Sequence, residues 1–488
     1  MKRMNQLRQL YSKQYFFYTT LTLSLAFGVG TISNTILSDD YAFIYSAKEF
    51  AAHAMEDGRP LSYLLINLTT LIPKEIVLLS LRIVGTCALL ITAILVSSHI
   101  YSKSRLSRFW PFATMSFCIP AFQVYAQAAY AFPLAIALLL STAAGLLILR
   151  DSKVYNVVGM FVLVAALSTY QMSALFALNL FVITLVSEYK STIQLRRFVW
   201  NVFFLSCGIL IYFATIVLLK SLINLDFKSR FSTVSLFDVP EKIVWFITRP
   251  LTLSFMPLTL RSPSVFEVII FGGTTLALVI LFLSKLGDDK AKRDNYTIYI
   301  AYFSSQVISL SPLLISRDNQ IEPRMLIANQ WINSFLLFSQ ASLSLEKIFC
   351  KFHRPWIGIR SIAANKVIII SIAAILVINS NYRFIEYIYK PYNSKVEFIE
   401  QMLQSCVNRE KIAIIKRESS WPTRNMLGVW SQKTDLSSDW VPVPAVAFQL
   451  SRNSLNGIEL LDAKEKAINL FSDTCIIYLQ EFRENSMA

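Results

Sequence analysis

Apolar stretches of about 20 residues recur along most of the chain and are separated by short clusters of Lys and Arg. A helix needs about 20 apolar residues to cross the hydrocarbon core of a bilayer, and irregular backbone cannot face lipid. Hydrophobic residues make up 55% of the 488 residues and charged residues only 16%, with a mean hydropathy of +0.50. The pattern therefore predicts a polytopic α-helical membrane protein.

The apolar stretches divide residues 1–380 into about eleven expected transmembrane helices. They lie at 14–37, 76–98, 109–149 (two helices joined by a tight turn), 154–169, 173–186, 199–220, 265–286, 296–316, 325–345 and 366–380. The first stretch is too long for the core of a cleavable signal peptide, so we expect it to remain as an anchor. An odd number of spans places the two termini on opposite sides of the membrane.

The distribution of Lys and Arg among the loops sets the expected orientation. These residues are concentrated in the loops on the side of the N-terminus, which we therefore expect to be cytoplasmic. The segments expected to face outward are 38–60, 221–264, 317–324 and the tail after 381. We attribute the net charge of +15 to the cytoplasmic loops. Because no soluble nucleic-acid-binding module accompanies it, we expect no nucleic acid partner.

The first outward segment, Ser38–Pro60, has the sequence SDDYAFIYSAKEFAAHAMEDGRP. Its apolar residues recur at helical spacing and its charged residues occupy the other face, which predicts an amphipathic helix at the bilayer surface over about 39–57. Gly58 followed by Pro60 is a helix stop. The apolar stretch 61–72 is too short to cross the membrane and is expected to be a second juxtamembrane helix.

Residues 381–488 are expected to form a separate small α/β domain on the outer side. Residues 412–415 and 475–479 have the composition of buried strands, and 460–471 that of a helix. A first helix is expected from apolar residues at helical spacing, which are Val396, Ile399, Leu403 and Cys406. Cys406 and Cys475 both lie at expected strand edges in an oxidising compartment, so they form either a disulfide or two buried free thiols.

Asp39 and Asp40 are adjacent carboxylates directly after the first span. A carboxylate at this level of the membrane can deprotonate the hydroxyl of an attacking acceptor. Side chains of adjacent helix-start residues diverge by about 100°, so only one of the two is expected to point into a cleft. In the alternative interpretation, both residues only cap the surface helix.

Three arginines are candidates for binding a lipid phosphate, because the guanidinium group donates paired hydrogen bonds to phosphate. Arg59 follows the helix stop, and Arg324 lies directly before a span begins. For each of them, contact with the membrane interface is an equally good explanation. Arg82 lies inside the second span, where a charge is costly, so it is expected to face a polar cleft or to pair with a carboxylate.

Polar and aromatic residues at the outer ends of the spans are candidates for sugar contacts. Residues 123–127 and the pair Tyr170 and Gln171 form expected hairpin tips, where interface-belt residues are the alternative. The loop 221–264 mixes aromatic and basic residues and is either a lid or a passive surface helix. The three histidines, His53, His99 and His353, fall on different sides of the membrane, so we expect no metal site.

Several of these residues also carry a family resemblance. DDY (Asp39, Asp40 and Tyr41) follows the first span and DGRPLSYLL (Asp57–Leu65) precedes the second, with weaker support from Tyr170, Gln171 and the turn Glu322-Pro323-Arg324. In these motifs, which cover the first hundred residues best, the chain resembles the serotype-converting O-antigen glucosyltransferases of Gram-negative bacteria and their phages. Those proteins are polytopic enzymes of the GT-C class, and their size, topology and outward tail agree with the pattern here.

The resemblance implies a GT-C fold in the bacterial inner membrane, with the N-terminus in the cytoplasm and the C-terminal domain in the periplasm. It also implies undecaprenyl-phosphate glucose as donor, a sugar of the lipid-linked O-antigen as acceptor, and an inverting single displacement. Asp39 or Asp40 would be the base and the arginines would hold the phosphate, while Tyr41, Tyr170 and Gln171 are the candidate acceptor or sugar contacts. No metal or other cofactor is expected.

Two other classes of protein share some of these features. A transporter or flippase of lipid-linked sugars tends to show internal repeats and charges at mid-membrane, whereas we find no repeat and place the acidic pair at the outer surface. An O-antigen polymerase or ligase also uses outward arginines, but it does not require an Asp pair directly after the first span. Both classes remain alternatives.

Overall fold

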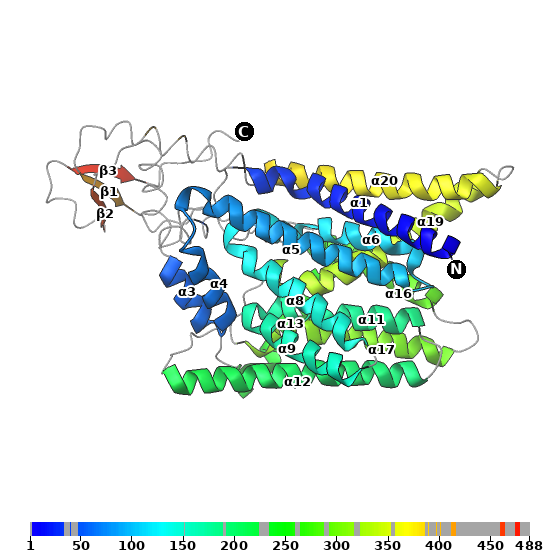
Figure 1. Ribbon diagram of the computed structural model, residues 1–488, viewed down its shortest axis with the longest axis horizontal. Coiled ribbons are helices and arrows are strands. Elements are labelled where there is room, and N and C mark those ends of the chain that lie inside the picture. Colours follow the sequence, from blue (N-terminus) through cyan, green and yellow to red (C-terminus); the bar gives the residue numbers. More distant parts are fainter. Residues whose placement is uncertain are drawn as a thin grey trace.

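The computed structural model of the chain shows a bundle of helices with a small β-sheet beyond one end (Figure 1). The residues that the structure describes are 2–33, 40, 47–150, 152–188, 192–223, 234–258, 264–286, 292–316, 323–352, 357–385, 389, 397, 401, 411–415, 459–463 and 474–478.

Within these residues, six helical segments are long and apolar enough to cross a membrane. They are Ile76–Ser102, Ala129–Ile148, Gln171–Glu188, Ile193–Leu222, Val265–Leu286 and Lys366–Phe384, and two shorter apolar helices are Phe16–Ile32 and Lys153–Thr169. The chain is therefore a multi-pass α-helical membrane protein, as its composition predicts.

The helices of the bundle lie where the apolar stretches predict them. Their bounds are α1 (Lys2–Ile32), α5 (Lys74–Ser102), α8 (Phe132–Ile148), α9 (Lys153–Thr169), α11 (Ala177–Glu188), α12 (Thr192–Ile223), α16 (Gly273–Leu286), α17 (Lys292–Ser309), α19 (Ile327–Phe352) and α20 (Ile357–Phe384). Short helices complete the described part of the bundle: α6 (Trp110–Met115), α7 (Gln123–Gln127), α10 (Gln171–Ala174), α13 (Val239–Phe246), α14 (Thr252–Ser254), α15 (Val265–Glu267) and α18 (Ser311–Ile315).

The first half of the stretch 109–149 differs from the expected continuous span. It consists of α6, two 3₁₀ turns (Ser116–Cys118 and Pro120–Phe122) and α7. The break follows from Pro120, since proline cannot continue the helical hydrogen-bond ladder and favours an extended residue before it. Ile119 is extended accordingly, with φ −71° and ψ 157°. This broken segment is buried in the middle of the bundle, where protein rather than lipid surrounds its irregular backbone.

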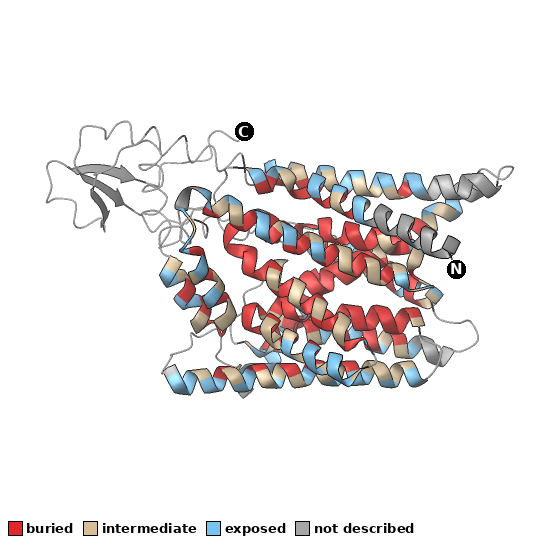
Figure 2. Ribbon diagram, in the orientation of Figure 1, coloured by how far each residue is buried: buried red, intermediate tan, exposed pale blue. Residues whose placement is uncertain are grey.

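Burial is graded from the centre of the bundle to its periphery (Figure 2). The broken segment and α11 are almost entirely buried and α8 is mostly buried, whereas α12 and α20 expose apolar side chains along much of their length. Apolar side chains on the outside of a membrane protein face hydrocarbon, which is as apolar as they are. The outer helices are therefore consistent with lipid contact.

Glycine permits close packing between α5 and the broken segment. A Cβ added at Gly85 would lie 2.6 Å from the carbonyl oxygen of Tyr125 and 3.7 Å from the Cα of Phe132. Real Cβ atoms do not approach backbone this closely, so α5 can pack this close to the backbone of Tyr125 only because residue 85 is glycine. The contact fixes Tyr125 against α5, which matters for the polar cluster described below.

Two short helices, α3 (Ala47–Glu56) and α4 (Pro60–Thr69), lie at one end of the bundle (Figure 1). They confirm the helices expected around 39–57 and 61–72, although residues 41–46 lie outside the described residues. Gly58 separates them with φ 66°, a left-handed conformation that glycine adopts without a steric penalty. Pro60 then starts α4, where its fixed φ suits the first helical turn.

The two ends of the bundle differ in character. Basic side chains secure the end near the N-terminus: Lys103 Nζ lies 2.6 Å from Glu188 Oε1, and Arg105 Nη1 donates to the carbonyl of Leu286 at 2.8 Å. Arg197 Nη2 likewise donates to the carbonyl of Leu149. Both acceptors lie at helix C-termini, where positive charge is favourable. The end that carries α3, α4 and the sheet is the opposite one (Figure 1).

The tail contains a three-stranded parallel sheet in the order β2-β1-β3. The strands are β1 (Lys411–Ile415), β2 (Glu459–Ala463) and β3 (Thr474–Tyr478). In register, Ile412 of β1 lies opposite Leu460 of β2 and Cys475 of β3. The strands expected at 412–415 and 475–479 are thus confirmed.

The helix expected at 460–471 is wrong over its first residues, because 459–463 form β2. A short apolar run such as Leu460 and Leu461 fits a helix or a buried strand equally well by periodicity. Pairing with the distant strand β1 decides between them. Cys406 and the first helix expected around it lie outside the described residues, apart from the isolated helical positions 397 and 401, so the disulfide with Cys475 stays a prediction.

Candidate functional site

Asp40 is fully buried, and Arg82 and Tyr130 are among its partners. Its Oδ2 lies 3.2 Å from Nη2 of Arg82, and its Oδ1 accepts a hydrogen bond from the backbone N–H of Tyr130 at 3.0 Å. Arg82, 2% exposed, also donates from Nη1 to the carbonyl of Ser33 at 2.7 Å. Burial of a charge is tolerated only when it is paired and hydrogen-bonded. Of the two environments expected for Arg82, a polar cleft or a carboxylate partner, the structure therefore confirms the carboxylate partner.

The structure does not describe the other two residues of the DDY motif. Asp39 and Tyr41 lie outside the described residues, so their candidate roles stay predictions. Of the acidic pair, the member with a known position is Asp40, and its carboxylate has 0% exposure.

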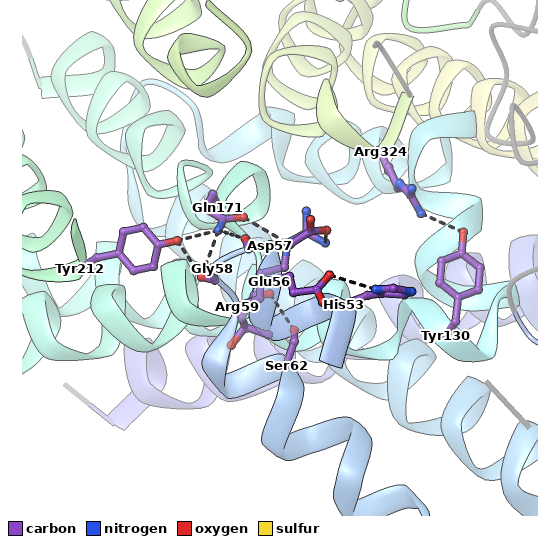
Figure 3. A network of polar contacts seen from close by, with 11 residues as sticks. His53, Glu56, Asp57, Gly58, Arg59, Ser62, Tyr130, Gln171, Tyr212 and Arg324 are labelled. Carbon is purple, nitrogen blue, oxygen red and sulfur yellow. Dashed lines mark hydrogen bonds and ion pairs between the residues drawn. The ribbon is translucent and has the colours of Figure 1, made fainter. Parts of the chain in front are cut away.

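The Gly58 turn is fixed by side chains from two other helices (Figure 3). The hydroxyl of Tyr212, in α12, donates to the carbonyl of Gly58 at 2.8 Å. The amide nitrogen of Gln171 donates to that hydroxyl at 2.7 Å and lies 3.3 Å and 3.4 Å from the carbonyls of Asp57 and Gly58. Because neutral groups satisfy these carbonyls, the turn presents the next residue, Arg59, in a defined direction.

The guanidinium group of Arg59 is oriented on three sides. Its Nε donates to Oε1 of Gln171 at 3.3 Å, its Nη1 lies 3.4 Å from Oδ2 of Asp57, and its central carbon lies 4.8 Å from the ring centroid of Tyr170. The Arg59 side chain is 25% exposed. None of the hydrogen bonds among described residues uses Nη2. This edge of the guanidinium is therefore available to an anion.

Arg324 belongs to a 3₁₀ turn, Pro323–Met325, directly before α19. Its Nη1 donates to the hydroxyl of Tyr130 at 3.0 Å, and its central carbon lies 5.7 Å from the centroid of the same ring. The hydroxyl of Tyr125 donates to the backbone carbonyl of Arg324 at 3.2 Å and lies 2.8 Å from the hydroxyl of Ser173. Arg324 is thus secured by two tyrosines of the broken segment and its continuation.

Two tyrosines, Tyr130 and Tyr125, connect these charges into one cluster, and Figure 3 shows Tyr130 beside Arg324. Tyr130 binds Asp40 through its backbone N–H and Arg324 through its hydroxyl. Tyr125 links the backbone of Arg324 to Ser173 of α10, and the same short helix contains Gln171, the partner of Arg59. The cluster lies at the end of the bundle that carries α3 and α4, and it combines two part-exposed guanidinium groups with a buried carboxylate.

The structure brings six of the predicted site residues together, namely Asp40, Arg59, Arg82, Tyr170, Gln171 and Arg324. It adds four that the sequence analysis did not single out, which are Asp57, Tyr125, Tyr130 and Tyr212. Tyr125 lies in the expected hairpin tip, and Tyr212 is a hydroxyl inside an expected span, so each had a weak signal. Gln123, also in the tip, instead donates to Ser380 of α20 at 2.8 Å.

The segment 234–258, part of the expected lid, is joined to α19 and α20. Asn333 Nδ2 donates to the carbonyl of Ser254 at 2.7 Å, and Gln330 Nε2 donates to that of Leu253 at 3.2 Å. Arg383, in the last turn of α20, donates to the carbonyl of Leu258 at 2.6 Å. The end of this segment is therefore anchored to the bundle in the present conformation.

The comparisons with known proteins assign no chemistry to this cluster. No protein-family model matches the chain, and no curated protein matches it. Among the residues that the structure describes, no group of three His, Cys, Asp or Glu side chains is arranged to hold a metal ion.

Proposed function

We propose that the protein is a membrane glucosyltransferase of the GT-C type. It transfers glucose from undecaprenyl-phosphate glucose to a sugar of the lipid-linked O-antigen on the periplasmic side of the bacterial inner membrane. The observation that carries the proposal is the convergence of Arg59, Arg324 and Asp40 in one cluster at the end of a multi-pass helical bundle. These are the groups that transfer of a sugar from a lipid phosphate requires.

In this proposal, Arg59 and Arg324 hold the departing phosphate. The open edge of Arg59 donates hydrogen bonds to the phosphate oxygens, and the position of the guanidinium is set in advance by Gln171 and Tyr170. Charge-assisted hydrogen bonds from a preorganised group stabilise the charge that develops on a leaving group. Because Tyr170 and Gln171 contact Arg59, we assign them to orient this arginine, and direct contact with a sugar stays a second prediction for both.

The Asp39–Asp40 pair supplies the base. The acceptor hydroxyl attacks the anomeric carbon as the bond from that carbon to the phosphate oxygen breaks, and the electron pair stays with the phosphate. The hydroxyl proton passes to the carboxylate, and the configuration at the anomeric carbon inverts. Asp40 is fully buried against Arg82 and Tyr130, so its action as the base requires the site to open.

The orientation supports a site on the outer side. Basic side chains gather at the end of the bundle near the N-terminus, and loops rich in Lys and Arg remain in the cytoplasm. The cluster, α3, α4 and the sheet of the tail lie at the other end (Figure 1). We propose that this end, with the C-terminal domain, faces the periplasm.

The decisive experiment uses the purified protein in liposomes with undecaprenyl-phosphate glucose labelled in the glucose and isolated lipid-linked O-antigen. We expect labelled polysaccharide and one released undecaprenyl phosphate for each glucose transferred. Movement of the intact labelled lipid between leaflets without cleavage would indicate a flippase. Joining of whole unlabelled repeats, or their transfer to a second acceptor, would indicate a polymerase or ligase.

Variants of the acidic pair test the assignment of the base. Asp39→Asn and Asp40→Asn are both expected to insert into membranes, and at least one is expected to abolish transfer. Full activity of both variants would refute the proposed base while leaving the phosphate site untouched.

A further inference from the structure

Asp57 places a negative charge next to the proposed phosphate site. It follows α3 directly, its side chain is 12% exposed, and its Oδ2 lies 3.4 Å from Nη1 of Arg59. Its backbone carbonyl is engaged separately, by the amide of Gln171. A carboxylate in this position reduces the attraction of Arg59 for any anion, so its presence in a phosphate site needs a chemical reason.

We infer that Asp57 is a specificity-determining residue that favours a singly charged lipid phosphodiester over a doubly charged lipid phosphomonoester. The inference rests on the proposed function, in which Arg59 and Arg324 hold the phosphate. Arg59, Arg324 and Asp57 together carry one net positive charge, and the pair of Asp40 and Arg82 adds none. That charge matches a phosphodiester, which carries a single negative charge.

The donor and the product of the proposed reaction differ in this charge. When the bond between the anomeric carbon and the phosphate oxygen breaks, the electron pair remains on the phosphate, and the acceptor proton leaves to the carboxylate base. A phosphodiester thereby becomes a phosphomonoester, whose second pKa is about 6, so its charge approaches −2 at neutral pH. Asp57 repels the product about twice as strongly as the donor, because Coulomb repulsion is proportional to the product of the charges.

Asp57 therefore promotes release of the product and slows the bond-breaking step. The same repulsion opposes the charge that builds up on the phosphate in the transition state. Removal of the carboxylate is expected to speed the first turnover and to slow later turnovers through retained product. The orientation of Arg59 is largely preserved in such a variant, because Gln171 and Tyr170 hold the guanidinium independently of Asp57.

The matched variants are Asp57→Asn and Glu56→Gln. Glu56 is the preceding residue in the chain and carries the same charge, and its Oε2 lies 3.1 Å from Nδ1 of His53. The titratable groups near Asp57 include Arg59, which forms the ion pair with it, and Tyr212. Both variants retain these groups and His53, so a comparison between them isolates the charge at position 57.

Affinities are measured for the full-length protein in non-ionic detergent, with undecaprenyl phosphate and with undecaprenyl-phosphate glucose, at pH 7.5 and pH 5.5. At pH 7.5 we expect Asp57→Asn to bind the monoester about tenfold more tightly and the diester about threefold more tightly. At pH 5.5, below the second pKa of about 6, most of the monoester carries one charge, and the two factors should converge. Glu56→Gln should preserve the wild-type ratio under both conditions.

The outcomes separate the inference from the function on which it rests. Equal tightening of both ligands at pH 7.5, or no tightening, contradicts the role of Asp57 even if the wild type binds both lipids. Failure of the wild type to bind either lipid overturns the proposed function and the inference together. Weaker binding by Asp57→Asn shows that Asp57 supports the site and also refutes the inference.

Discussion

The Asp40–Arg82 pair and the Arg59 turn are two arginine sites in one cluster, and they differ in what surrounds the guanidinium. Arg82 is 2% exposed and directly faces a carboxylate that is itself fully buried. Arg59 is 25% exposed, is held by an amide, an aromatic ring and the carboxylate of Asp57, and presents an open edge. The comparison teaches that an arginine near a membrane surface stabilises the fold when it is buried together with its partner, and is suited to ligand binding when its partners leave one edge of the guanidinium open.

Removal of the buried cation should have the largest effect. Arg82→Met leaves the carboxylate of Asp40 buried without its partner, which typically costs 3–5 kcal/mol, so we expect a loss of about 3–5 kcal/mol in the free energy of unfolding. Thermal unfolding of the purified protein in detergent measures it. The matched variant Arg59→Met should lose no more than about 1 kcal/mol, because its ion pair is part-exposed. Equal stability of the two variants would erase the distinction between the sites.

Removal of the part-exposed cation should instead affect the ligand. Arg59→Ala is expected to weaken binding of undecaprenyl phosphate by about 10- to 100-fold, since hydrogen bonds to charged groups contribute about 1.5–3 kcal/mol. Calorimetric titration in detergent micelles gives the affinity. Arg249→Ala, at an exposed arginine outside the cluster, serves as the control and should bind like the wild type. Unchanged binding by Arg59→Ala would leave no role for the open edge.

The smallest effect concerns the groups that hold the Gly58 turn. Tyr212→Phe removes the hydroxyl that donates to Gly58 and accepts from Gln171, so we expect a loss of about 1 kcal/mol in stability and severalfold weaker lipid binding. Tyr296→Phe, at a tyrosine that is 67% exposed, is the control for loss of a hydroxyl. Weaker binding with unchanged stability would indicate that Tyr212 contacts the ligand and not the turn.

The sequence predicts the helices well because the bilayer sets their length and composition. The pairing of α3 and α4 around Gly58 also follows from local chemistry, since a left-handed residue and a proline mark a stop and a start. The break at Pro120 is a partial exception. A proline signals a possible end, but only burial in the bundle makes an interrupted span stable there.

The composition of the cluster is much harder to predict, because its contacts join residues that are far apart in the chain. Gly58 and Tyr212 are separated by 154 positions, and Arg324 and Tyr130 by 194. Asp40 is bound by the backbone N–H of Tyr130, a group that every residue except proline carries and that no motif can reveal. The strand β2 is missed for a related reason, since its partner β1 lies elsewhere in the chain.

The central claim is that Arg59 and Arg324 hold the same phosphate, and a double-mutant cycle tests it most directly. The affinity for undecaprenyl phosphate is measured for the wild type, Arg59→Ala, Arg324→Ala and the double variant. If both arginines bind one phosphate, each single change should cost at least about tenfold, and the double variant should lose clearly less than the product of the two factors. Strictly multiplicative losses, or full affinity in either single variant, would contradict a shared phosphate site.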